Sequence, residues 1–142
     1  MPKHVSLPIS ILGLLLAGSA LAQDAPRRGH HSVNVSTHRE GQVAYYASPD
    51  ESCGKGLPPE ITIAEHPSYG KIIFRRDRLT AFAATIPPRA AKCRGQFVDV
   101  TTVFYKPAGK FHGSDRVVLR VRFPAPDGSA DTLIDEIYIT VR

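Results

Sequence analysis

Six basic side chains in the middle of the chain form the strongest candidate for a binding surface. Three lie at the end of an expected strand and three flank the second cysteine. Arginine forks bind carboxylate and phosphate through paired hydrogen bonds. If Cys93 folds back towards the first half, the six charges share one side and predict contact with an anionic partner; the alternative is scattered, solvated charge. The six residues are Arg75, Arg76, Arg78, Arg89, Lys92 and Arg94.

Three histidines nearer the N-terminus offer a different chemistry. His30 and His31 are adjacent, and His38 follows. Imidazole nitrogens bind Cu²⁺ and Zn²⁺, so a metal-handling function is one alternative; the other interpretation is a solvated tail. Calcium needs six to eight oxygen ligands. Three acids in expected loops could contribute to such a site, so calcium binding stays open: Asp115, Asp127 and Asp131.

The sequence contains no motif for nucleophilic, zinc-dependent or phosphate-binding catalysis. Two adjacent carboxylate pairs occur, Asp50-Glu51 and Asp135-Glu136. Neighbours on a strand point to opposite faces, so neither pair forms an acid/base couple. We therefore expect a protein that is not an enzyme and has no cofactor. A small hydrolase whose site is assembled from distant residues is the remaining catalytic alternative.

Residues 1–22 have the features of a secretion signal. Lys3 provides a basic start, an apolar core covers residues 9–17, and Ala20-Leu21-Ala22 suits signal peptidase. The alternative is an uncleaved membrane anchor, but a spanning helix needs about 20 apolar residues. We expect cleavage after Ala22, no stable membrane span afterwards, and a periplasmic or secreted protein. Residues 23–31 are then a flexible polar tail before a domain at 32–142.

Two cysteines, Cys53 and Cys93, are the only ones in the chain. In the oxidising compartment of an exported protein, such a pair closes into a disulfide. A ring of about 40 residues is worth about 4 kcal/mol in the chain-entropy description. The alternative is a redox or metal-binding pair, but neither cysteine has the spacing of such a motif.

Apolar residues alternate with polar ones between turns rich in proline, glycine and aspartate. The pattern is clearest in 116–123 and 133–141, and it predicts further strands at 97–106 and 71–75. A further strand is predicted at 79–86, where the alternation is least regular. The other expected strands cover 32–37, 42–47 and 61–64. Seven or eight short strands predict an all-β sandwich or barrel, and stacking two antiparallel sheets is the simplest way to bury one face of each strand.

Two stretches resemble bacterial immunoglobulin-like and cadherin-like repeat domains. One is the Pro-x-x-Gly turn in residues 66–72, and the other is Tyr-x-Pro-x-x-x-Phe-x-Gly-x-Asp in residues 104–117. The resemblance covers about 40–142 and implies an immunoglobulin-like sandwich. The chain departs from those domains in being a single unit without internal repeats and in carrying the Cys53–Cys93 pair. The physics of the second motif is structural: its aspartate accepts backbone N–H bonds before the next strand. The matching residues are Tyr105, Pro107, Phe111, Gly113, Asp115 and Val117.

The formal net charge of +5 suits an anionic partner, although it is also ordinary for an exported protein. We expect a non-catalytic binding or structural module that contacts a protein or an anionic cell-envelope component. Sheet edges and the loops at 87–96 and 107–115 are the expected contact sites. No aromatic platform interleaves the charges, so nucleic acid is not an expected partner. The oligomeric state does not follow from the sequence.

Overall fold

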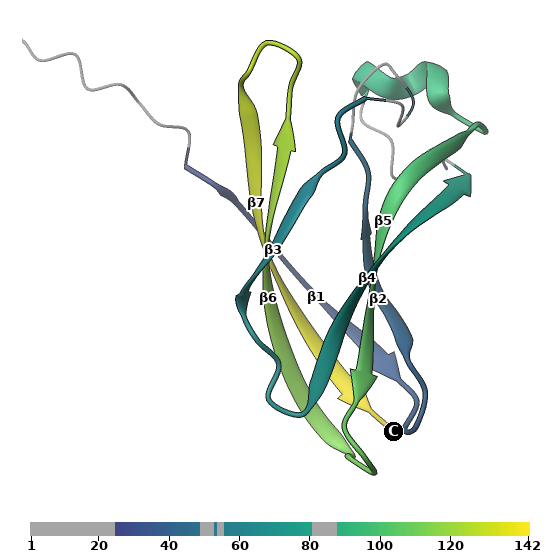
Figure 1. Cartoon of the computed structure of the whole chain (residues 1–142), viewed down its shortest axis with the longest axis vertical. Coiled ribbons are helices and arrows are strands. Elements are labelled where there is room, and N and C mark those ends of the chain that lie inside the picture. Colours follow the sequence, from purple (N-terminus) through teal and green to yellow (C-terminus); the bar gives the residue numbers. More distant parts are fainter. Residues whose placement is uncertain (1–24, 49–52, 54–55, 81–87) are drawn as a thin grey trace, which may run out of the picture.

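The computed structural model describes residues 25–48, 53, 56–80 and 88–142, and it shows two stacked β-sheets (Figure 1). One sheet, here called sheet A, has the order β1-β7-β6-β3, and sheet B has the order β2-β5-β4. The strands are β1 (Arg27–Val35), β2 (Gly41–Tyr46), β3 (Glu60–Glu65), β4 (Gly70–Thr80), β5 (Phe97–Pro107), β6 (Gly113–Pro124) and β7 (Ala130–Val141). The expected all-β sandwich of seven strands is confirmed.

The strand order is that of an immunoglobulin-like sandwich. The second, fifth and fourth strands form one sheet, and the seventh, sixth and third form the other. The first strand joins the second group. It departs from the expected antiparallel arrangement, because β1 runs parallel to β7. All other pairings in the described part of the chain are antiparallel.

The predicted flexible tail at 23–31 is wrong for its second half. Strand β1 already begins at Arg27, and residues 27–31 pair with residues 133–137 of β7. The segment is polar and lacks the alternation that indicates a strand. Its partner strand lies more than 100 residues away in the sequence, so the pairing leaves no local signal. Residues 1–24 lie outside the described part of the chain, and with them the expected signal peptide and its cleavage point.

Strand β4 is longer than the sequence predicts. Two separate strands were expected at 71–75 and 79–86, but one strand runs from Gly70 to Thr80 and pairs with β5 throughout. The polar run of Arg76, Asp77 and Arg78 does not interrupt it, because this part of β4 is exposed at the sheet edge, where strand side chains need not be apolar. Residues 81–86 lie outside the described residues.

The core lies between the sheets and uses the alternation that the sequence displays. The inward positions in Asp115–Val121 of β6 and Asp135–Val141 of β7 are fully or almost fully buried, whereas the outward Arg120 and Tyr138 are exposed. Complete burial of each such aliphatic side chain contributes about 1.5–3 kcal/mol. The buried aliphatic residues of these two strands' inner faces are Val117, Leu119, Val121, Ile137, Ile139 and Val141.

The disulfide between Cys53 and Cys93 is present. Cys53 lies in the connection from β2 to β3, and Cys93 ends a short 3-10 helix, η2 (Pro88–Cys93), between β4 and β5. The bond therefore ties two connections together rather than crossing the middle of the core. None of the described residues belongs to a helix with the length and apolarity that crossing a bilayer requires.

Removal of this disulfide should lower the free energy of unfolding by about 4 kcal/mol, because the unfolded chain regains the freedom of a ring of about 40 residues. Urea unfolding of the C53S/C93S variant, followed by circular dichroism, measures the change. Addition of reductant should destabilise the native protein and leave the variant unaffected. Two free thiols in the air-oxidised protein, counted by mass spectrometry, would contradict this account.

Candidate functional site

Two buried carboxylates join the sheets. Asp115 on β6 and Asp135 on β7 occupy inward positions of sheet A and are 7% and 6% exposed. Each accepts a hydrogen bond from a tyrosine of sheet B: the Tyr105 hydroxyl donates to Asp115 Oδ2 over 2.8 Å, and the Tyr46 hydroxyl donates to Asp135 Oδ2 over 2.6 Å. A buried charge is tolerated only when it is paired or hydrogen-bonded, so these tyrosines make both positions possible.

Asp115 also holds the turn that leads into β4. Its carboxylate accepts hydrogen bonds from the backbone N–H groups of Ser68 and Tyr69, over 2.9 and 2.8 Å, and from that of Arg116. The two stretches that resemble repeat domains thus meet at one side chain. The expectation that Asp115 accepts backbone N–H bonds at a corner is confirmed.

These contacts decide the protonation of the pair. Burial by itself would raise the pKa of Asp115, but the hydrogen bonds from Ser68, Tyr69, Tyr105 and Arg116 outweigh it and hold the pKa below its ordinary value. Burial, reinforced by the bond to Asp115, raises the pKa of Tyr105. The aspartate is therefore ionised and the tyrosine neutral over the physiological range, as a stable donor–acceptor pair requires.

The neighbouring motif residues support this corner. A Cβ atom on Gly70 would lie 2.3 Å from the Tyr105 ring, so only glycine allows the turn to approach the ring. The Phe111 ring packs against the core and stacks on Tyr69, with 4.4 Å between ring centres. Gly113 has a φ of 134°, which favours glycine. The motif is thus used for packing, and it exposes no reactive group.

A hollow of about 330 Å³ between β1, β2 and β7 brings together a histidine, a carboxylate and a hydroxyl. His31 on β1 places Nδ1 3.5 Å from Asp135 Oδ1, and its Nε2 lies 2.9 Å from the carbonyl oxygen of Val43. Tyr46 completes the group through its bond to Asp135. Sequence reasoning missed this set because its members come from three strands; the only signal was that each lies at an inward position of its strand.

The chemistry of this hollow is that of a structural clamp. Both ring nitrogens of His31 face partners, so neither is directed at open space as a catalytic base would be. Burial, followed by the bond to Asp135, raises the pKa of Tyr46 far above its ordinary value, which keeps the hydroxyl a donor. The three side chains hold β1, β2 and β7 together.

The predicted histidine metal site is not assembled. His30 and His31 are neighbours in β1 and point to opposite faces of sheet A, and His38 lies in the turn that follows the strand. Within residues 25–48, 53, 56–80 and 88–142, no three histidine, cysteine or carboxylate side chains are placed to share a metal ion. The loop acids considered for calcium are separated as well: Asp115 is buried, and Asp131 pairs with Arg27.

The structure divides the expected basic cluster. Arg75 is at an outward position of β4, where it forms an ion pair with Glu40 and lies over the Phe104 ring at 4.7 Å. Arg76 and Arg78 lie opposite Thr101 and Asp99 of β5 in the strand register. They are on the inner face of sheet B, the same face that contributes Tyr105 and Val103 to the core. Strand alternation therefore separates Arg75 from the other two arginines.

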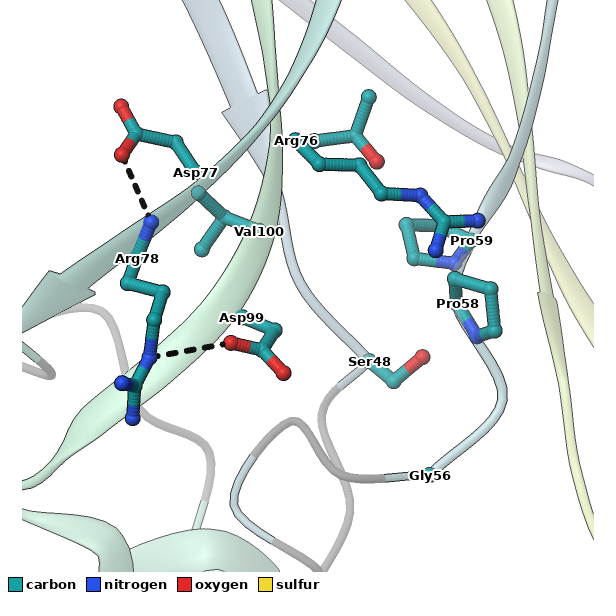
Figure 2. Close-up of a pocket in the computed structure, with 10 residues that line it drawn as sticks. Ser48, Gly56, Pro58, Pro59, Arg76, Asp77, Arg78, Asp99 and Val100 are labelled. Carbon is teal, nitrogen blue, oxygen red and sulfur yellow. Dashed lines mark hydrogen bonds and ion pairs between the residues drawn. The ribbon is translucent and has the colours of Figure 1, made fainter.

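Arg76 and Arg78 line a hollow of about 380 Å³ where the sheets separate (Figure 2). The Nε of Arg78 lies 3.2 Å from Asp99 Oδ1, so this charge is paired. Arg76 has no carboxylate partner among the described residues, and its guanidinium extends towards Pro58 and Pro59. The lining residues are Ser48, Gly56, Pro58, Pro59, Arg76, Asp77, Arg78, Asp99, Val100 and Thr101.

The remaining members of the cluster belong to the segment around η2. Lys92 is exposed at the end of this helix and Arg94 is exposed just after it. The side chain of Arg89 lies outside the described part. Figure 1 shows η2, the short green helix, at the end of the molecule where β4 ends and β5 begins, so this segment and the last residues of β4 share one end of the sandwich.

No family model, curated protein or solved structure matches this chain. The geometry of the sites is thus the basis for assigning a function.

Replacement of Asp115 by asparagine should lower the unfolding free energy by about 3 kcal/mol, because an amide NH₂ then faces buried donors. The pKa of Asp115 is lower in the folded than in the unfolded state. The stability it contributes is therefore present above about pH 4 and is lost as the pH falls further. Urea unfolding between pH 7 and pH 3 should show a shallower acid loss in D115N.

The matched control for this experiment is Asp127→Asn, which changes an exposed turn aspartate bonded only to Ser129. It should retain nearly all of the native stability at neutral pH. Equal stability of D115N and D127N would show that the Asp115 network does not hold the sheets together.

Proposed function

We propose that this chain is an exported, non-catalytic binding module that contacts an anionic group of a protein or cell-envelope component through the hollow beside Arg76. The features of residues 1–22 and the closed disulfide support export, since structural disulfides persist mainly in oxidising compartments. The periplasm or the exterior of the cell is the proposed location.

The unpaired guanidinium of Arg76 carries the proposal. The other two arginines of β4 are bound to Glu40 and Asp99, whereas Arg76 has no carboxylate partner among the described residues. Its side chain projects into a concave region at the open end of the sandwich, opposite two prolines (Figure 2). An arginine fork placed in such a hollow can bind a carboxylate or phosphate through two hydrogen bonds.

The likeness to immunoglobulin-like repeat domains supports a binding role. The Asp115 corner joins the start of β6 to the turn before β4, so the opposite end of the sandwich is available for contacts. The alternative of a small hydrolase would draw on His31, Asp135 and Tyr46. Those groups bind one another and Val43, and this mutual satisfaction favours a structural role for them.

Titration of the oxidised protein with inorganic phosphate and with succinate, followed by NMR chemical shifts, tests the proposal. Shifts should concentrate at Arg76 and the residues that line its hollow. The R76Q variant should bind at least about tenfold more weakly, because it loses a charge-assisted bidentate contact. The matched control is R39Q, which removes an exposed arginine from the turn between β1 and β2. Identical titrations of R76Q and the native protein would refute the site.

A further inference from the structure

The outer face of sheet A, which points away from sheet B, carries a charge arrangement that the sandwich does not need. Outward positions alternate along β1, β7, β6 and β3. Four of them are arginines and three are glutamates. These charged residues are Arg28, Arg116, Arg120, Arg122, Glu60, Glu65 and Glu136.

Two of the four arginines use all three glutamates. Arg116 forms ion pairs with both Glu65 and Glu136, bridging three strands. Arg122 places Nη1 3.0 Å from Glu60 Oε2. The Arg116 network also covers Val118, an outward residue that is only 7% exposed. The Arg122–Glu60 pair is neutral, whereas the group around Arg116 has two carboxylates for one guanidinium.

The other two arginines lie in one row across the sheet. Arg28 of β1 and Arg120 of β6 both pair in register with Ile134 of β7, so the three side chains share the outer face. Arg28 and Arg120 are exposed, and neither has an acidic partner in the described part of the chain. With strands about 4.8 Å apart, their Cα atoms are about 10 Å apart.

We propose that this row, Arg28-Ile134-Arg120, is a binding surface for an acidic polysaccharide. Two unpaired guanidinium groups at fixed separation suit a chain that repeats its carboxylates or sulfates. Ile134 is half-buried between them and forms the apolar part of the surface between the two arginines. Further along β7, Tyr138 is 44% exposed and presents an aromatic surface to a sugar ring.

The composition of the face argues against other macromolecules. A protein interface of ordinary size has a fully buried apolar centre, whereas the apolar side chains described near this row are the half-buried Ile134, the exposed Tyr138 and Val118, which is already buried. Stable attachment to a bilayer requires apolar side chains that enter the acyl region, and none projects from this row. A rigid, level sheet with spaced positive charges fits an extended polyanion, which does not need a deep pocket.

This inference stands apart from the hollow beside Arg76. The row belongs to sheet A, whereas Arg76 belongs to sheet B. The alternation in 116–123 puts Arg120 on the outward face of its strand, but nothing in the sequence indicates that Arg28 lies beside it. Only the parallel pairing of β1 with β7 brings the two together.

Binding of oligogalacturonate to the oxidised protein, measured by isothermal titration calorimetry at low and at physiological salt, tests the proposal. The native protein should bind, with an affinity that falls as salt rises. The R28Q/R120Q variant should bind at least about tenfold more weakly. R76Q should bind oligogalacturonate as the native protein does, which separates this surface from the proposed function.

The matched control is R39Q/R142Q, which removes the same number of positive charges from exposed positions outside the row. It should weaken binding by no more than about twofold. An equal loss in the two double variants would reduce the effect to net charge and overturn the proposal. Binding to vesicles containing phosphatidylglycerol, without binding to oligogalacturonate, would overturn it in favour of a membrane surface.

Discussion

Two hydrogen bonds from tyrosine hydroxyls to buried aspartates cross the interior, and the rest of the sandwich is arranged around them. Tyr105 to Asp115 and Tyr46 to Asp135 each join a strand of sheet B to a strand of sheet A. A carboxylate placed inside a sandwich of this size is costly unless its oxygens are satisfied. The surrounding geometry provides that satisfaction: a glycine that lets the turn approach, two backbone N–H groups and an adjacent histidine.

This constraint also explains why His31, Asp115 and Asp135 have their polar atoms occupied by neighbouring groups. The histidine, the buried acids and the core tyrosines are occupied in mutual contacts that position strands. The groups that retain binding capacity are arginines at the periphery, where the sheets diverge and on the outer face of sheet A. A rigid frame with peripheral cations is suited to holding an anionic partner, and the disulfide stiffens the end that carries Arg76 and Arg78.

Much of the fold could be predicted from local patterns. The residues of β6 and β7 alternate so regularly between apolar and polar that both strands were predicted, and the Asp115 corner follows from the motif that contains it. The second half of β1 was expected within 32–37, but its first half could not be found in this way, because the sequence of Arg27–His31 is polar and its partner strand is distant. The continuity of β4 was missed for a related reason: an edge strand outside the core does not need apolar residues.

The sequence by itself determined which residues face inward on the regular strands and that Cys53 and Cys93 are available to pair. Those properties depend on the two-residue period of a strand, on residue type and on backbone sterics, all of which are local. Only the tertiary structure decided that His31, Asp135 and Tyr46 meet, that Arg75 is separated from Arg76, and that Arg28 lies in line with Arg120. The register between strands decides which residues become neighbours. It depends on packing across the whole core, so it cannot be read from a short stretch of sequence.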